Sequence, residues 1–227
     1  MDSIIIASTN LNKIDRIKAL LRDTNIKIQS LSDLGLKNLV EPDETANTCV
    51  GIAAQKALMY VEQLKPGVYV LTQDDTLKLL GVKEKDNPKT SIKQPVIERF
   101  GKFNDEYAVR YYSELAKKYG GKIPIIFEYG HSMAIKTSDP RSRIFLVSSY
   151  STLEARITCT PNGLDKVPGY FLSALLQVKI KNRWLDYTTL IEKQKVDVDS
   201  DLKKSILGLV NSITSLVYKH GRNYEQT

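Results

Sequence analysis

One apolar run that ends in two aspartates constrains this chain more than any other feature. Residues 67–76 are Gly-Val-Tyr-Val-Leu-Thr-Gln-Asp-Asp-Thr, so a predicted β-strand leads directly to Asp74 and Asp75. Ligands of open α/β sheets bind outside the carboxyl ends of the strands, and Mg²⁺ takes one or two carboxylates together with phosphate oxygens and water. The run therefore predicts a divalent-metal site for phosphate chemistry. Alternatively, the two aspartates only end the strand and cap the next segment.

A second strand and turn stand at the start of the chain. Residues 3–8 predict a buried parallel strand, and residues 14–21 predict a helix with one apolar face. The turn at 9–13 lies at the amino end of that helix, where free N–H groups, Asn10 and Lys13 favour a polyphosphate. Such units are common in α/β proteins, so the turn indicates phosphate binding only together with other motifs.

The rest of the chain predicts an α/β fold with a mixed β-sheet flanked by helices. Strand and helix patterns alternate in the first half, and strand-like runs separated by turn signals follow. Alternating βα units followed by antiparallel hairpins indicate a mixed sheet. We expect further strands at 26–30, 123–129 with 133–136, 143–150, 153–159, 174–180 and 184–190, and further helices at 47–64, 106–119 and 201–219.

Three segments are predicted to be neither helix nor strand. Residues 33–48 predict a loop that carries Glu41 and Glu44. Residues 83–102 are polar, rich in lysine and contain two prolines, so we expect an excursion or a lid there. The polar residues 221–227 are expected to form a flexible tail.

The composition excludes several classes of protein. With 227 residues, 42% hydrophobic and 26% charged, the chain is expected to be globular, as one large domain or as two lobes around a shared core. No apolar run is long enough to cross a bilayer and the start lacks a signal-peptide pattern, so we expect a cytoplasmic protein without membrane contact. Cys49 and Cys159 offer neither a metal spacing nor a disulfide framework. The net charge of +7 favours polyanionic ligands, either nucleotides or nucleic acid.

Three motifs in the first third carry a family resemblance. Residues 8–13, Ser-Thr-Asn-Leu-Asn-Lys, resemble a T-x-N-x-x-K phosphate loop. Residues 44–57 align without gaps to E-x-G-x-T-F-x-E-N-A-x-x-K-A, with Glu44 twelve residues before Lys56, and residues 73–76 resemble A-D-D-S. In this order the motifs resemble the inosine triphosphate pyrophosphatase family, enzymes that remove aberrant purine nucleoside triphosphates.

The later matches to the same family are looser. Residues 169–174 fall where the family has G-F-G-Y-D-P, and residues 192–195 and 200–202 fall where it has E-E-K and S-H-R. The Ser-Asp-Leu at 200–202 is similar to the family members encoded by cassava brown streak viruses. The resemblance covers nearly the whole chain, strongly in the first third and weakly near the carboxyl end.

The resemblance implies an elongated, two-lobed α/β fold with a central cleft, usually as a homodimer. It implies Mg²⁺-dependent hydrolysis of inosine and xanthosine triphosphates and their deoxy forms to a monophosphate and pyrophosphate. Glu44 and Asp75 would hold Mg²⁺, Asp74 would support them, and Asp75 would orient or deprotonate the attacking water. The implied substrate-binding residues are Ser8, Thr9, Asn10, Lys13, Lys56, Phe171, Ser173, Lys195, Ser200 and Asp201.

The departures from the family pattern fall on positions that the resemblance assigns to recognition of the nucleobase. Ser173 replaces an Asp, and Asp201 and Leu202 replace His-Arg, which removes donors for a purine 6-keto oxygen. Gly51 replaces a Glu of the helix, and Glu41 could stand in for it.

These departures leave two alternatives open. One is a protein that kept the fold but binds RNA or a viral replication protein through its positive charge. The other is a Maf-like pyrophosphatase that prefers modified pyrimidine nucleotides. Both remain compatible with the residues named above.

Overall fold

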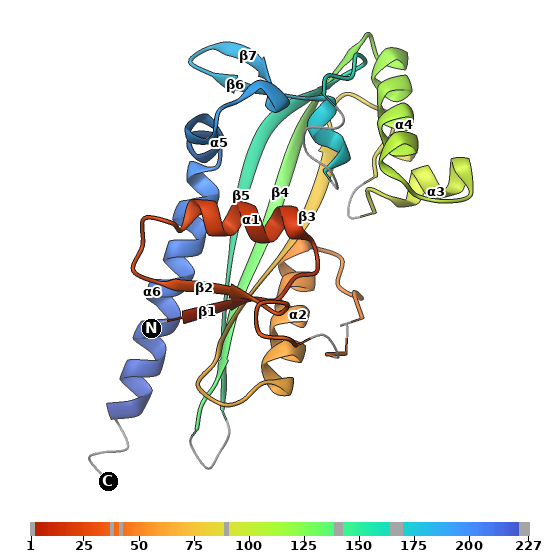
Figure 1. Ribbon diagram of the computed structural model, residues 1–227. Helices are drawn as coiled ribbons and strands as arrows, with labels where there is room; N and C mark the ends of the chain where they lie inside the picture. The colour runs from red at the N-terminus through yellow and green to blue at the C-terminus, as the bar shows by residue number, and fades with distance from the viewer. Residues whose placement is uncertain are drawn as a thin grey trace. The chain divides into compact units, whose positions relative to one another are not determined.

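A mixed seven-stranded β-sheet forms the framework of the chain (Figure 1). The computed structural model describes residues 3–36, 39–40, 43–88, 91–138, 143–163 and 170–222. The strand order is β2-β1-β3-β4-β5-β6-β7; β1 pairs in parallel with β2 and β3, whereas β6 pairs antiparallel with β5 and β7. The predicted α/β class with a mixed sheet is confirmed. The strands are β1 (Ser3–Ile6), β2 (Lys27–Ser30), β3 (Tyr69–Leu79), β4 (Lys122–Lys136), β5 (Ile144–Thr158), β6 (Leu176–Ile180) and β7 (Arg183–Asp186).

The helices flank this sheet. Among the described residues, none of the helices combines the length and the apolar character that a membrane span needs. The α-helices are α1 (Leu11–Leu20), α2 (Cys49–Gln63), α3 (Gln94–Phe100), α4 (Asp105–Lys118), α5 (Glu192–Val198) and α6 (Ser200–Arg222), and short 3₁₀ turns are η1 (Glu84–Asp86), η3 (Phe171–Ala174) and η4 (Tyr187–Thr189).

The chain divides into two compact units, each built from separate stretches of sequence. The first unit comprises Met1–Asp74, Tyr129–Ser151 and Asp201–Thr227, and the second comprises Asp75–Glu128 and Thr152–Ser200. Three of the four boundaries fall inside β3, β4 and β5, so these strands supply residues to both units, and the fourth falls after Ser200, the first residue of α6.

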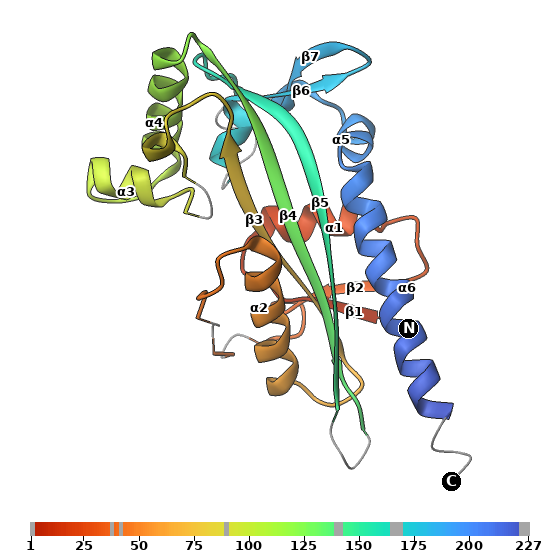
Figure 2. The same cartoon turned by 180° about the vertical axis from the view of Figure 1, so that it is seen from behind.

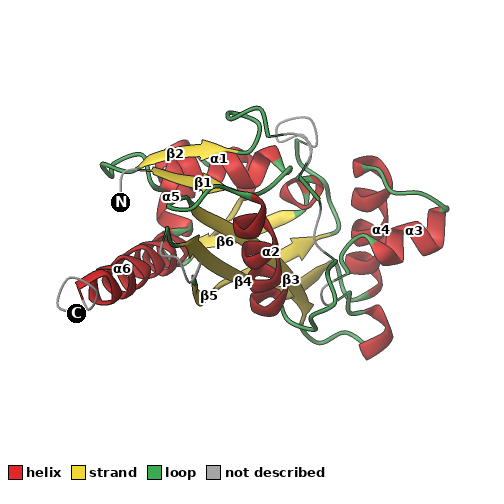
Figure 3. Cartoon of the chain, turned by 90° about the horizontal axis from the view of Figure 1, so that it is seen from below, coloured by secondary structure: helices red, strands yellow, loops and turns green. Residues whose placement is uncertain are grey.

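In the first unit, helices cover both faces of the parallel strands. Figure 2 shows α2 in front of the strands and α1 behind them, and Figure 3 shows α2 against β3 and β4. Thr72 of β3 donates its hydroxyl hydrogen to the carbonyl of Ala53 in α2 (2.6 Å). Burial of apolar side chains between these layers stabilises the unit. One buried cluster consists of Ile5, Ala7, Leu31, Ala57, Tyr60, Val61, Leu64, Val70 and Ala134.

In the second unit, α4 follows its sequence signals closely. Asn104 caps its amino end by accepting a hydrogen bond from the Tyr107 N–H (2.7 Å), a contact worth about 1 kcal/mol. Gly120 and Gly121 end the helix with positive φ values of 86° and 88°. Tyr112 is buried and donates its hydroxyl hydrogen to the Ile92 carbonyl (2.8 Å). The predicted helix at 106–119 is therefore confirmed.

The prediction that the strand at 67–76 ends at the two aspartates is wrong. β3 continues to Leu79, because Leu77 and Leu79 carry on the apolar pattern and are buried. The parallel partner ends first: β1 stops at Ile6, and the Ala7 N–H donates to the Leu71 carbonyl (2.9 Å). The aspartates thus lie beyond the end of β1 but within β3.

Two further strands are longer than predicted. Residues 123–129 and 133–136 form one strand, β4, and residues 143–150 and 153–159 form another, β5. Gly130 makes no turn; a Cβ there would lie 2.3 Å from the carbonyl carbon of Cys49, so the glycine permits α2 to approach β4.

The region at 83–102 is not a bare loop. It contains η1 and α3, and Pro95 stands in the first turn of α3, where proline is tolerated. The role of this region as a lid stays a prediction. The short helix α5 at Glu192–Val198 has no counterpart in the sequence prediction, because seven residues give too little periodicity.

Candidate active site

The turn after β1 is held by its own side chains. Asn10 caps α1: its Oδ1 accepts hydrogen bonds from the N–H groups of Asn12 (3.0 Å) and Lys13 (3.3 Å). The Asn10 N–H in turn donates to Ser8 Oγ (3.1 Å). Two of the N–H groups expected to bind phosphate are therefore already used by the cap.

Lys56 lies on helix α2, whose buried apolar face sets the direction of the Lys56 side chain. Thr48 caps its amino end by accepting a hydrogen bond from the Gly51 N–H (3.1 Å). Ala53, Ala57 and Val61 are completely buried at helical spacing, as the sequence predicted. This packing fixes the rotation of the helix about its axis and so the direction in which Lys56 leaves it.

Lys56 joins two carboxylates from different segments. Its Nζ lies 2.6 Å from Glu44 Oε1 and 3.0 Å from Asp74 Oδ1. The side chains of Lys56 and Asp74 are 18% and 13% exposed, whereas Glu44 is 53% exposed. Burial by itself would lower the pKa of Lys56, but the negative charge of Asp74 and the hydrogen bond to Glu44 outweigh it and raise the pKa. Lys56 is therefore a permanent cation at neutral pH.

A pocket of about 170 Å³ brings the early motifs together. It contains residues from the turn after β1, from the loop at 33–48, from α2 and from β3. Six residues predicted for the site line it: Ser8, Thr9, Asn10, Lys13, Glu44 and Lys56.

Three residues of the pocket, Ala7, Tyr60 and Gln73, were not predicted for the site. Tyr60 stands four residues after Lys56 on α2, so helical spacing could have found it. Gln73 belongs to the quoted motif at 73–76 but had been given no role.

The two aspartates lie differently along β3. Asp74 faces Lys56, and since side chains alternate along a strand, Asp75 shares its face of β3 with Gln73. Asp75 is the first residue of the second compact unit. Its role as metal ligand and base stays a prediction.

The later predicted residues have clear structural contacts of their own. Phe171 is buried, with its ring stacked on Tyr112 (5.9 Å between centroids) and edge-on to Phe103 (5.5 Å). Ser173 is also buried, and its Oγ has no hydrogen-bond partner in the described part of the chain. Lys195 Nζ lies 5.3 Å from the centre of the Tyr187 ring.

The last two predicted residues begin α6. Ser200 is its first residue, and Asp201 lies in its first turn, where a negative charge favours the helix dipole. Asp201 pairs with Lys204 (2.8 Å) and is exposed. Glu41 and Gly169 lie outside the described residues.

The carboxylates of the pocket fit Mg²⁺ only in company with phosphate. Within the described ranges, no group of three or more His, Cys, Asp or Glu residues could hold a metal. Glu44 and Asp74 nevertheless converge on one cationic atom, the Lys56 Nζ. Mg²⁺ is commonly bound by one or two carboxylates plus phosphate oxygens and water. The donor set therefore suits a metal ion that arrives with a polyphosphate.

Comparison with known sequences points to one family. The model of the Ham1 family matches residues 4–86. A dITP/XTP pyrophosphatase of Clostridium tetani (strain Massachusetts / E88) is 34% identical over 76 residues, which are 34% of this chain and 37% of that protein. The match thus spans little more than a third of the curated relative.

Comparison with solved structures extends the similarity in fold to nearly the whole chain. The Ham1 protein of Coxiella burnetii has a TM-score of 0.65 at 19% identity, covering 95% of this chain and 99% of that one. The Ham1 protein of Staphylococcus aureus has a TM-score of 0.59 at 19% identity, covering 94% and 98%. A nucleoside-triphosphatase / dITP/XTP pyrophosphatase of Mycobacterium abscessus has a TM-score of 0.57 at 16% identity, covering 91% and 98%.

The two kinds of similarity agree on the segments that form the pocket. The family model covers the turn after β1, Glu44, α2 and β3, and the fold similarity covers the rest. Residues 4–86 are thus similar in sequence to the Ham1 family, and nearly the whole chain is similar in fold to solved Ham1 proteins.

Proposed function

We propose that this chain is a Mg²⁺-dependent nucleoside triphosphate pyrophosphatase. It hydrolyses inosine and xanthosine triphosphates and their deoxy forms to a monophosphate and pyrophosphate, and so removes aberrant nucleotides from the pool. The observation that carries the proposal is the pocket in which Lys13 and Lys56 stand with Glu44, while Asp74 pairs with the same Lys56. The name of the Clostridium tetani relative, a dITP/XTP pyrophosphatase, supports the same substrate class.

Some of the described residues neutralise the charge of the substrate, and others position the substrate or the metal ion. Lys13 and Lys56 balance the negative charge of the triphosphate, and Ser8, Thr9 and Asn10 supply polar groups beside it. Glu44 with Asp75 would hold Mg²⁺, and Asp74 would support them through Lys56. When bound, Mg²⁺ would neutralise phosphate charge and assist activation of water.

The reaction requires one displacement at phosphorus. Asp75 orients the attacking water or accepts its proton, and the water oxygen forms a bond to the α-phosphorus. The bond from the α-phosphorus to the bridging oxygen breaks, and pyrophosphate leaves with the electron pair. Lys56 and Lys13 stabilise the charge that develops on the leaving group. No covalent intermediate is needed.

The test compares pyrophosphate release by the parent with that of Glu44→Gln and Asp75→Asn, with and without Mg²⁺. Both variants should lose at least about 100-fold in kcat, as expected when a general base or a charged orienting group is removed. Their thermal unfolding midpoints should stay close to the parental value. Parental turnover in both variants would show that the assigned metal and water roles are wrong.

The preferred base is tested with a panel of triphosphates. Ser173 and Asp201 differ from the family pattern at positions that would read a purine, and buried polar groups at such positions decide selectivity. Preference for inosine and xanthosine triphosphates would support the proposal. Preference for modified pyrimidine nucleotides would favour the Maf-like alternative.

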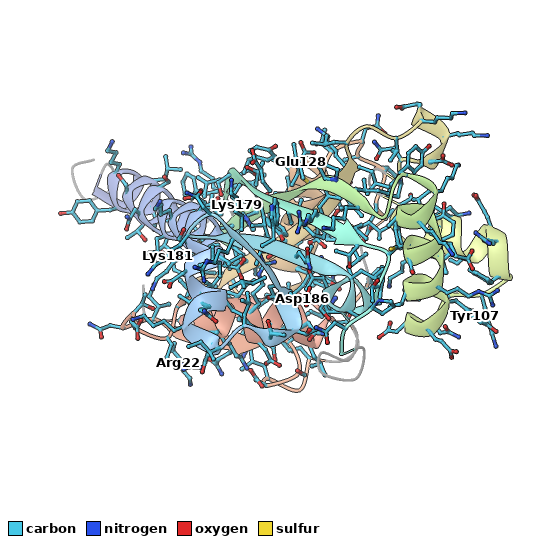
Figure 4. The ribbon with its side chains drawn as sticks, turned by 90° about the horizontal axis from the view of Figure 1, so that it is seen from above. Arg22, Tyr107, Glu128, Lys179, Lys181 and Asp186 are labelled. Atoms are coloured by element: carbon cyan, nitrogen blue, oxygen red, sulfur yellow. The ribbon has the colours of Figure 1, made fainter. Side chains whose placement is uncertain are left out.

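A second candidate function is binding of RNA, or of a viral replication protein, by a surface of the second unit. The β6–β7 hairpin exposes Lys179, Lys181 and Arg183, of which the first two are labelled in Figure 4. Arg156 lies 4.3 Å from the centre of the Trp184 ring. Basic and aromatic groups together favour single-stranded nucleic acid.

The RNA candidate is tested by salt titration. Replacing Lys179 and Lys181 by Gln should reduce the slope of log affinity against log salt by about 1 to 2. RNA binding without turnover of any nucleotide would favour this candidate. Turnover without salt-dependent RNA affinity would exclude it.

Two parts of the proposal rest on the family resemblance alone. They are a homodimer and an origin among the viral members, the latter supported by Ser200-Asp201-Leu202. The proposed cytoplasmic location rests on the sequence pattern described above. Sedimentation equilibrium tests the dimer: a single species of the monomer mass, 25.6 kDa, would contradict it.

A further inference from the structure

Gln55 ties the segment that carries Glu44 to helix α2. The Ala46 N–H donates to Gln55 Oε1 (3.1 Å), and Gln55 Nε2 donates to Thr45 Oγ1 (2.7 Å). One side-chain amide therefore uses its acceptor and one of its donors on two consecutive loop residues. Those two residues directly follow Glu44, and Gln55 directly precedes Lys56.

The same loop segment packs closely on the first turn of α2. A Cβ added at Gly51 would lie 2.8 Å from the Ala46 Cβ and 3.1 Å from Thr48 Oγ1. The methyl group of Ala46 thus occupies the space that any side chain at position 51 would need. Where the family pattern E-x-G-x-T-F-x-E has Gly and then Glu, this chain has Ala46 and Gly51. In this chain the loop lies against the helix and within hydrogen-bond distance of Gln55.

Glu44 depends on such an anchor because its own surroundings are open. It lies in a segment with neither helix nor strand, and more than half of its side chain is exposed. An exposed ion pair by itself holds a side chain weakly. Anchoring the backbone of the next two residues limits the positions that the Glu44 carboxylate can reach from Lys56.

We propose that Gln55 is a positioning residue that holds Glu44 at the pocket for the metal and phosphate. The inference deepens the proposed function and rests on it for the role of Glu44. Removing the contacts of Gln55 should weaken binding of a metal–phosphate complex without unfolding the protein. Ligand orientation of this indirect kind is commonly worth about 10-fold to 100-fold in metal affinity or activity.

Gln63 on the same helix provides a matched control. Its Oε1 accepts a hydrogen bond from the Val40 N–H (2.8 Å), and its Nε2 donates to the carbonyls of Val40 (3.2 Å) and Met59 (3.1 Å). It therefore ties the same loop to α2 at the other end, and it is not among the described residues that line the pocket. Gln55→Met and Gln63→Met remove equivalent side-chain hydrogen bonds and keep an unbranched side chain of high helix propensity.

The experiment measures binding of Mn²⁺ with pyrophosphate by water proton relaxation in the parent and both variants. Hydrogen exchange of the Ala46 amide and the thermal unfolding midpoint are recorded on the same samples. In Gln55→Met, the Ala46 amide should exchange faster and the dissociation constant should rise about tenfold. The thermal unfolding midpoint should fall by similar amounts in Gln55→Met and Gln63→Met. In Gln63→Met, however, the dissociation constant should stay at the parental value.

A double-mutant cycle tests whether the effect runs through the observed contact. Thr45→Val removes the hydroxyl that accepts from Gln55, so combining it with Gln55→Met should cost less than the sum of the two single changes. Additive effects would contradict the proposed contact.

The outcomes separate this inference from the proposed function. If Gln55→Met and the parent bind Mn²⁺ with pyrophosphate equally well, the positioning role is overturned. The same holds if neither protein binds. An equal loss in Gln63→Met overturns it as well. If Gln55 is required for binding but the parent releases pyrophosphate from no triphosphate, the positioning role stands and the proposed function fails.

Discussion

At the scale of single residues, Lys56 organises the pocket because it satisfies two carboxylates at once. Loss of one partner of a partly buried ion pair leaves the remaining charge without compensation, which costs more than an exposed pair would. The cation that pairs with Glu44 and Asp74 is thus part of the fold as well as of the proposed chemistry.

The raised pKa of Lys56 predicts a stability difference that depends on pH. A lysine whose pKa is raised on folding contributes stability that is complete below its unfolded pKa, 10.5, and is lost as the pH rises through the folded value. Urea unfolding should therefore find Lys56→Met less stable than the parent by a constant amount between pH 7 and 10, and the difference should shrink above that range. A difference that grows above pH 10.5 would contradict the assignment.

Asp33 predicts the opposite dependence at acid pH. The hydrogen bond from Lys18 Nζ (2.8 Å) and then that from the Ser30 N–H (2.8 Å) lower the pKa of Asp33 from 3.8 to about 2. Its contribution is present above pH 3.8 and is lost as the pH falls through about 2. Thermal unfolding from pH 5 to pH 2 should show Asp33→Asn less stable at pH 5 and converging with the parent near pH 2. Asp23→Asn, whose carboxylate is 85% exposed and 3.8 Å from Lys203, is the control.

At the scale of elements, close approach of α2 to β4 is a feature that periodicity does not reveal. Both elements have sequence patterns that predict them separately, and neither pattern specifies where they touch. Gly130 marks the point of contact because a side chain there would enter the backbone of Cys49 and Val50. Interiors pack too densely for such a clash to be absorbed by small shifts.

Two glycine substitutions test this packing. Gly130→Ala would place its Cβ 2.3 Å from backbone atoms of α2, so it should destabilise the protein by about 3 kcal/mol or more. Gly208→Ala in α6 meets nothing within 4 Å and should stabilise by about 1 kcal/mol, because glycine is a poor helix former. Chemical unfolding measures both. Equal effects of the two substitutions would refute the contact between α2 and β4.

At the scale of the whole molecule, the segment that the family model matches does not form a unit by itself. Residues 4–86 contain β1, β2 and β3, but the first compact unit also needs residues 129–151 and 201–227. Ala134, Ile144 and Leu146 pack against the cluster that includes Ile5 and Val70. The segment that is similar in sequence to the family is therefore not the same as the set of residues that packs into one compact unit.

The prediction is that a fragment of residues 4–86 does not fold. Without β4, β5 and α6 it would leave one edge of β3 and much apolar surface in water. Circular dichroism should show little ordered structure and no cooperative thermal transition, while the full chain shows one. Cooperative unfolding of the fragment would mean that the shared strands contribute less to the unit than their packing indicates.

The sequence by itself determined four of the α-helices and six residues of the pocket. Residue spacing at a period of 3.6 or 2 specifies a helix or a strand locally, and α1, α2, α4 and α6 were found in this way. The motifs at 8–13 and 44–57 identified six residues that line one pocket. These features depend on neighbours in the chain, so they can be read without the fold.

Only the tertiary structure decided how those parts meet. Gly130 lies against α2, Lys56 pairs with two carboxylates, and Gln55 forms hydrogen bonds with Thr45 and Ala46. Each of these contacts joins residues that are not neighbours in the chain. A local pattern carries no information about a partner in another segment, because that contact exists only after the chain has packed. Packing, rather than periodicity, thus placed Asp74 against Lys56 and Ala46 against Gly51.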